Sequence, residues 1–176
     1  MTLLKACLCF TLGGPLVAAA QPAGESLPGA ANYTRLEATV ACGGATTAEA
    51  WPELRSRGFT TVINLRQASE PGADIEAATR AAQAAGLRYI HIPLSGANPQ
   101  ASVVDAFLAA VSDPANSPVY IHCGSANRVG AVWLVKRMLV DGWDERRALA
   151  EAEAIGLKNA ALRDFMLAYV REHQRK

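Results

Sequence analysis

Hydrophobic and polar positions change in a regular rhythm along this chain, and the rhythm predicts strands alternating with helices. Short apolar runs, rich in β-branched residues, predict buried strands at 59–65, 87–94 and 119–121, and a further short strand is expected within 32–40. Apolar residues three or four apart predict helices at 73–85, 99–112, 128–141, 144–156 and 159–173. Alternating elements of this kind predict an α/β fold with a mostly parallel sheet flanked by helices on both faces.

Local signals suggest where several helices begin. Thr46 and Glu49 have the spacing of a capping box, which would open a short helix that ends near Gly58. Asn98 stands directly before a proline, the arrangement of an N-cap followed by proline at the first helical position. Asp144 is expected to cap the helix that follows it. The chain thus predicts compact elements joined by short turns.

Composition and charge narrow the class of protein. The chain has 176 residues, enough for one domain with a substantial core. Its formal net charge is +1, and no lysine-rich or arginine-rich block precedes the last few residues, so we expect no nucleic-acid partner.

The first 20 residues are expected to be a signal peptide. Lys5 is a lone basic residue before an apolar stretch, and three alanines at 18–20 form a small-residue cleavage site. We expect a flexible leader at 21–31 and a single domain at 32–176. The mature protein would be periplasmic or secreted, with no membrane association after cleavage. Cys7 and Cys9 would leave with the signal peptide, so that Cys42 and Cys123 remain.

The junction after residues 119–121 carries the strongest chemical signal. A predicted strand stops at His122 and Cys123, a loop of small residues follows, and Arg128 opens a helix. The N-terminus of a helix favours a thiolate over a thiol, and its unpaired N–H groups can hold a tetrahedral anion. Arginine offers a fork of donors that matches two phosphate oxygens. A nucleophile, an anion cradle and a charge clamp therefore fall within six residues.

This junction resembles the phosphate loop of the cysteine-dependent protein tyrosine phosphatase superfamily. The sequences GFTTVINLR at 58–66 and YIHIPL at 89–94 are similar to two strands of dual-specificity-like phosphatases. The sequence HCGSANRVGAVW at 122–133 looks most like a bacterial group related to the domain fused to β-lactamase-like hydrolases. The similarity covers about residues 40–169.

The resemblance implies a phosphatase that acts on a phosphorylated protein or small molecule. Cys123 would attack phosphorus and form a phosphocysteine that water hydrolyses. Arg128 would clamp two phosphate oxygens, and His122 would fix the loop and help to hold the thiolate. The phosphate would lie on the loop residues, which are Gly124, Ser125, Ala126, Asn127 and Arg128. The resemblance implies no metal and no other cofactor.

The chain differs from the superfamily at three points. Four residues, rather than the usual five, separate Cys123 from Arg128. Val129 stands where a serine or threonine commonly helps the thiolate to leave. The loop at 95–99, where a general acid aspartate is usual, contains no carboxylate, so that Glu70 and Asp74 become the candidates for the general acid.

These differences leave two other functions open. A cysteine and an arginine at this spacing also occur in rhodanese-like sulfurtransferases, in which Cys123 would carry a persulfide. A catalytically weak phosphate-binding protein is the third possibility, because a proton donor and the hydroxyl after the arginine are both missing. A thiosulfate-to-cyanide assay beside a p-nitrophenyl phosphate assay separates the first two, and phosphate binding without turnover indicates the third.

Cys42 lies where relatives carry a small loop packed near the phosphate loop. A Cys42–Cys123 disulfide that buries the nucleophile is therefore a hypothesis, and a free Cys42 is its alternative.

Overall fold

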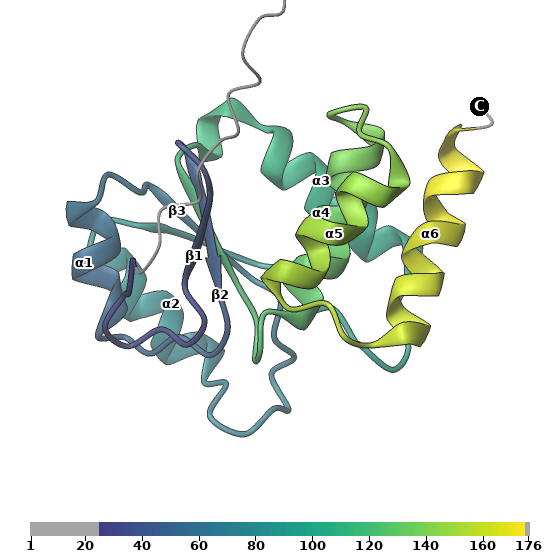
Figure 1. Ribbon diagram of the computed structural model, residues 1–176. Coiled ribbons are helices and arrows are strands. Elements are labelled where there is room, and N and C mark those ends of the chain that lie inside the picture. Colours follow the sequence, from purple (N-terminus) through teal and green to yellow (C-terminus); the bar gives the residue numbers. More distant parts are fainter. Residues whose placement is uncertain (1–24, 175–176) are drawn as a thin grey trace, which may run out of the picture.

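The computed structural model describes residues 25–174 and places a five-stranded sheet between two layers of helices (Figure 1). The strands lie in the order β1-β2-β5-β3-β4. They are β1 (Thr34–Glu37), β2 (Val40–Gly43), β3 (Thr61–Asn64), β4 (Arg88–His91) and β5 (Val119–His122). Only β1 is antiparallel to its neighbour, and the other three pairings are parallel. The predicted α/β fold with a mostly parallel sheet is confirmed.

Helices cover both faces of the sheet. Two of them, α1 (Ala50–Ser56) and α2 (Ile75–Ala84), lie on one face. The other face carries α3 (Ala101–Ser112), α4 (Asn127–Leu139), α5 (Glu145–Ile155) and α6 (Ala160–Gln174). A short 3-10 helix, η1 (Pro114–Asn116), precedes β5. None of the helices within residues 25–174 is long and apolar enough to span a membrane.

Strand β5 divides the core into two parts because successive side chains of a strand point to opposite faces. Tyr120 packs with Trp51 and Phe59 beneath α1 and α2. Ile121 and Cys123 pack on the other face, in the larger cluster that α4 fills. Cys123, the candidate nucleophile, therefore lies on the α4 side of the sheet.

Several predicted boundaries are corrected. Thr46 and Glu49 form no capping box: the Thr46 hydroxyl donates to the carbonyl of Gly44, and Glu49 makes no side-chain cap. Helix α3 begins after Gln100 rather than at Asn98. Asp144 does cap α5, by accepting from the N–H of Arg147 at 2.9 Å.

The N-terminal segment is partly packed. The expected signal peptide at 1–20 lies outside the described residues. Within the expected leader, Leu27 is buried, and the N–H of Ala31 donates to the carbonyl of Ala45 at 2.9 Å. The part of this segment at 25–31 is thus packed on the domain through Leu27, which adds apolar area to the core beside α1.

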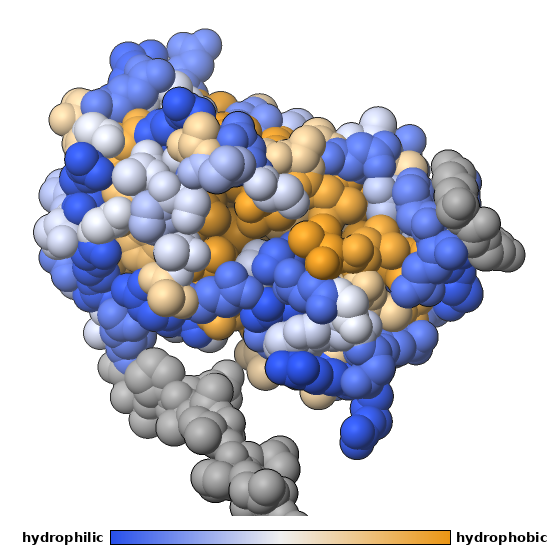
Figure 2. Space-filling model, turned by 90° about the horizontal axis from the view of Figure 1, so that it is seen from above, coloured by the Kyte–Doolittle hydropathy of each residue, from blue (hydrophilic) through white to orange (hydrophobic). Residues whose placement is uncertain are grey.

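One end of the molecule carries a band of hydrophobic surface. Seen from above, apolar atoms gather across the middle of this face and hydrophilic residues surround them (Figure 2). The loop that follows β5 lies at the lower side of Figure 1, away from this face. The hydrophobic band and the chemically interesting loop therefore occupy different ends of the protein.

Candidate active site at the end of strand β5

The loop after β5 turns sharply into α4. Ala126 has a left-handed backbone with φ of 65°, and α4 begins at the next residue. Within residues 25–174, the N–H groups from Gly124 to Arg128 have no protein acceptor. Unpaired N–H groups at a helix start form a ready site for an anion. The four-residue spacing thus still leaves five loop N–H groups available to an anion.

Cys123 is fully buried and lies beside the start of α4. It belongs to the apolar cluster that includes Ala126 and Val129. Arg128 follows on the first turn of α4, and its guanidinium is turned inward, since only 13% of the side chain is exposed. Burial lowers the pKa of Arg128, but its hydrogen bond to Glu70 and its attraction to Cys123 raise that pKa overall. The loop therefore brings Cys123 and Arg128 together, as the sequence predicts.

Arg128 is held by four hydrogen bonds. Its Nη1 donates to Glu70 Oε1 at 2.5 Å, and its Nη2 donates to Glu70 Oε2 at 2.8 Å. Nη1 also donates to the carbonyl oxygens of Leu65, at 3.2 Å, and Leu94, at 3.1 Å. No acceptor within residues 25–174 bonds Nε. The edge of the guanidinium formed by Nε and Nη2 thus keeps donors that a phosphate can use.

Glu70 is part of this site, but its carboxyl group is ionised and therefore cannot donate a proton. The hydrogen bonds from Arg128 hold the pKa of Glu70 at about 2, and the N–H of Gln67 adds a further one at 2.7 Å. A carboxylic acid with this pKa is ionised at neutral pH. In this arrangement Glu70 has no proton to give, and its role is to orient Arg128.

Asp74 makes no hydrogen bond to the phosphate loop within residues 25–174. Its carboxylate accepts from the N–H of Ala77 at 2.9 Å and caps α2. It lines a separate cleft of about 550 Å³ together with Arg66 and the segment 45–48. Asp105, on α3, is hydrogen-bonded to Tyr169 instead. The structure therefore brings Glu70 to the loop and leaves the other two acids elsewhere.

His122 is buried on the opposite face of the sheet from Cys123. Its ring stacks on Tyr120, with centroids 6.0 Å apart, and neither ring nitrogen has a hydrogen-bond partner within residues 25–174. Burial, together with the charge of Arg66, lowers the pKa of His122 to about 3. The imidazole is therefore neutral and supplies no positive charge to the sulfur.

Cys42 and Cys123, the two cysteines within residues 25–174, are free thiols. Cys42 lies on β2 and pairs with Ile121 of the neighbouring strand, so Cys42 and Cys123 point to the same face of the sheet. Burial, with a further contribution from Cys123, raises the pKa of Cys42 to about 12. The hypothesised disulfide is not formed in this structure, and Cys42 stays protonated.

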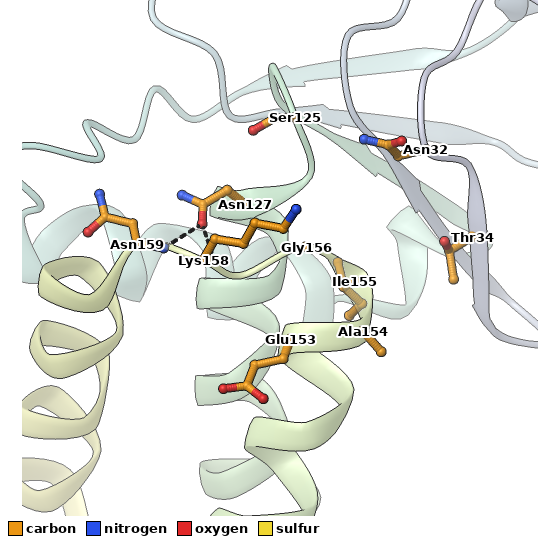
Figure 3. A pocket seen from close by; sticks show the side chains of 10 residues that line it. All are labelled: Asn32, Thr34, Ser125, Asn127, Glu153, Ala154, Ile155, Gly156, Lys158 and Asn159. Carbon is orange, nitrogen blue, oxygen red and sulfur yellow. Dashed lines mark hydrogen bonds between the residues drawn. The ribbon is translucent and has the colours of Figure 1, made fainter.

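Asn127 fixes the loop to the segment between α5 and α6. Its Oδ1 accepts from the N–H of Lys158 at 2.7 Å and from the N–H of Asn159 at 3.1 Å (Figure 3). Gly156, with φ of 140°, allows this segment to approach: a side chain there would come within 3.2 Å of the carbonyl oxygen of Ser125. The sequence assigned Asn127 to the anion site, and the structure gives its side chain a bracing contact. Residues 25–174 hold no cluster of side chains suited to a metal ion.

The family of the chain is shown by its sequence. Residues 24–164 match the model of the DSP-PTPase phosphatase fused to NAD+ kinase, and the chain belongs to this family. The family model places the chain in the protein tyrosine phosphatase superfamily, in the dual-specificity-like group. The resemblance noted at residues 122–133 is thereby confirmed.

Curated relatives and solved structures agree with this assignment. A β-lactamase hydrolase-like protein from Xylella fastidiosa (strain Temecula1 / ATCC 700964) is 33% identical over 104 residues. These residues make up 57% of this chain, and the chain covers only 22% of that relative's length. The catalytic core of the PP-IP phosphatase SIW14 from S. cerevisiae has a TM-score of 0.68 and 17% identity, over 85% of this chain and 94% of that one. For P. aeruginosa TpbA the TM-score is 0.62 and the identity 22%, over 82% and 91%. At these identities the structures show the shared fold.

Proposed function

We propose that the protein hydrolyses phosphomonoesters through a phosphocysteine formed on Cys123. The observation that supports this most is the inward-turned Arg128, which lies beside Cys123. Within residues 25–174 its Nε edge has no acceptor, and neither have the five N–H groups of the loop. Charge on phosphorus-bound oxygens grows and shifts in the transition state, and donors fixed in advance stabilise it. The family assignment supports a phosphatase over a sulfurtransferase.

The first step would transfer the phosphoryl group. The Cys123 thiolate attacks phosphorus, the S–P bond forms, and the bond from phosphorus to the ester oxygen breaks. The loop amides and the free edge of Arg128 bind the three remaining oxygens. The leaving oxygen takes its proton from water, because Glu70 is ionised by its contact with Arg128.

The second step would return the thiolate. Water attacks phosphorus, the S–P bond breaks, inorganic phosphate leaves, and one proton of that water passes to the solvent. Val129 is fully buried and has no hydroxyl to support the departing sulfur. We therefore expect the second step to be the slower one, with phosphocysteine accumulating during turnover.

A burst experiment tests this mechanism. On mixing with p-nitrophenyl phosphate, the protein should release about one equivalent of nitrophenol per site rapidly and then continue more slowly, a pattern that indicates a covalent intermediate. Acid-quenched protein should carry one phosphoryl group on the peptide that contains Cys123. Cys123→Ser should bind phosphate and show neither burst nor turnover. Turnover by this variant would show that the nucleophile is another group.

A phosphate-binding protein without turnover is the second candidate. The ionised Glu70 and the buried Val129 favour it, because each withholds a group that speeds one of the two steps. Phosphate or vanadate binding with no nitrophenol release would establish it.

We also propose that the chain is exported. The apolar stretch and small-residue site at 1–20 support this, although these residues lie outside those described. N-terminal sequencing of protein recovered from the periplasm should give Gln21 as the first residue. Retention of Met1 in a cytoplasmic fraction would contradict export.

A further inference from the structure

A cleft of about 960 Å³ opens directly beside the phosphate loop (Figure 3). Ser125 and Asn127 of the loop form one wall, and Asn32 and Thr34 of the N-terminal segment form the opposite one. The end of α5 and the segment leading to α6 complete the lining with Glu153, Ala154, Ile155, Gly156, Lys158 and Asn159. Its volume is that of a site for a whole small molecule. The cleft is therefore in a position to receive the part of a substrate that extends beyond its phosphate.

The position of Lys158 in this cleft is fixed by the phosphate loop itself. Asn127 directly precedes Arg128, and its Oδ1 accepts a hydrogen bond from the backbone N–H of Lys158 at 2.7 Å. Asn159 secures the same segment, because its Oδ1 caps α6 through the N–H of Leu162 at 3.0 Å and its Nδ2 donates to Gly96. The segment is thus anchored on both sides of the Lys158 side chain.

Most of the lining side chains are polar, and Lys158 places a cation near the loop. Asparagine amides and the hydroxyl groups of Ser125 and Thr34 line the cleft, and none of its lining residues in the described part of the chain is aromatic. In Figure 3 the Lys158 ammonium extends into the space between the loop and the N-terminal segment, whereas the Glu153 carboxylate points away from the loop. Neither side chain forms an ion pair with any residue from 25 to 174. Amides and hydroxyls suit the hydroxyl groups of a sugar-like molecule, and an unpaired ammonium suits an anion.

We propose that the substrate is a small hydrophilic phosphomonoester that carries a second anionic group, which Lys158 binds while the phosphate loop holds the first. This substrate class rests on the proposed phosphatase function, and Lys158 is its specificity-determining residue. A single charged contact of an exposed lysine changes affinity by about five- to tenfold. Glu153 weakens anion binding from the far end of the cleft.

A matched pair of sugar phosphates tests the proposal. Fructose 1,6-bisphosphate and fructose 6-phosphate differ by one phosphate, and p-nitrophenyl phosphate has a single anionic group on an aromatic body. The wild-type protein should show a kcat/KM about five- to tenfold higher for the bisphosphate than for the monophosphate. Lys158→Met should abolish this preference, and Lys158→Arg should restore most of it. Hydrolysis of p-nitrophenyl phosphate should be the same in all three.

Arg80→Met is the matched control. Arg80 is an exposed cation on α2, far in sequence from the site, and its removal changes the net charge by the same amount. This variant should keep the preference for the bisphosphate. Equal preference in wild type and Lys158→Met, or no preference in the wild type, would overturn the proposal. A Lys158 effect confined to phosphotyrosine peptides with a neighbouring acidic residue would also overturn it, in favour of a protein substrate.

Binding to Cys123→Ser separates this inference from the proposed function. If the wild-type protein hydrolyses none of the three compounds, the phosphatase proposal fails. Titration calorimetry of Cys123→Ser with the two sugar phosphates then decides the cleft alone. A bisphosphate Kd at least about fivefold lower, lost on adding Lys158→Met, supports the cleft, and equal Kd values reject it.

Discussion

Helix α4 carries two largely buried arginines, one at each end, and their surroundings differ in a way that separates function from structure. Arg137 is enclosed: its Nε and Nη2 donate to Glu151 at 2.6 and 2.9 Å, and its Nη1 contacts Asp141 and Glu37. The rings of Trp133 and Trp143 lie 4.8 and 4.2 Å from its guanidinium carbon. Arg128 also has a carboxylate, but Glu70 occupies the Nη1–Nη2 end and leaves the Nε edge without an acceptor in the described chain.

The difference shows how a buried ion pair can serve two purposes. Around Arg137, both edges of the guanidinium meet carboxylates from α5 and β1, so the cation joins three elements. Around Arg128, one edge is used to hold the side chain and the other remains for a ligand. A fixed donor edge that is not yet satisfied is what a phosphate-binding group requires. A guanidinium edge without an acceptor therefore distinguishes a ligand-binding arginine from a structural one better than burial or charge does.

The largest expected effect comes from changing the free edge. Arg128→Lys keeps the charge but cannot present two parallel donors, so kcat for p-nitrophenyl phosphate should fall by about 10²- to 10³-fold. Steady-state kinetics measures this, and thermal unfolding should show a folded protein. Arg137→Lys is the control, because the same chemical change there should leave kcat near the wild-type value. Equal losses of kcat in both variants would remove the functional distinction between the two arginines.

Loss of the enclosed arginine should act on stability instead. Arg137→Met leaves Glu151 without its cation and leaves Glu37 and Asp141 paired with Lys136 alone. Breaking a buried pair of this kind costs about 3 kcal/mol of unfolding free energy. Urea unfolding measures the loss. Arg80→Met, at an exposed pair, should change stability by less than about 0.5 kcal/mol. An Arg137→Met protein with unchanged stability and reduced kcat would contradict a structural role for Arg137.

Glu70, the carboxylate that orients Arg128, should affect catalysis less than Arg128 itself. Glu70→Gln keeps the size of the side chain but weakens the hydrogen bonds that orient the guanidinium, so kcat/KM should fall by about tenfold. Asp74→Asn is the control, because Asp74 caps α2 and lies on a different cleft. A larger loss in Asp74→Asn, with the alkaline fall of the pH–rate profile removed, would instead identify Asp74 as the general acid. Increased activity of Glu70→Gln would show that Glu70 competes with the substrate.

The alternation of elements and the junction at Cys123 could be predicted because both are local. A strand, a nucleophile, small residues and an arginine lie within one short segment, and the same positions reappear at the end of β5 and the start of α4. Local sequence did not correctly predict whether Thr46 and Asn98 cap helices. The Thr46 hydroxyl is hydrogen-bonded to the Tyr120 hydroxyl, 2.9 Å away, instead of capping a helix. Near Asn98, helix α3 begins after Gln100.

The long-range contacts of the site could not be predicted. Glu70 and Arg128 are separated by 58 positions in the sequence, and Asn127 reaches residues more than 30 positions away. Strand β2, which carries Cys42, was missed because three of its residues, Ala41, Cys42 and Gly43, are small and give no strong strand pattern. Sequence alone placed Glu70 among the acids that could approach the loop. Only the structure shows that the Glu70 carboxylate is ionised and hydrogen-bonded to Arg128.

The pH dependence of the Glu70 contact is the smallest effect and isolates the ion pair itself. Arg128 lowers the pKa of Glu70 from 4.5 to about 2, so the ionised carboxylate stabilises the folded state. This contribution is fully present above about pH 4.5 and is lost as the pH falls through the folded-state pKa near 2. The stability difference between wild type and Glu70→Gln, from urea unfolding, should therefore be constant from pH 5 to 7 and shrink steadily from pH 4.5 downward. Glu53→Gln, at an exposed pair with Arg57, should show a much smaller difference throughout. A difference for Glu70→Gln that persists unchanged at pH 2.5 would mean that shape and not charge holds Arg128 in place.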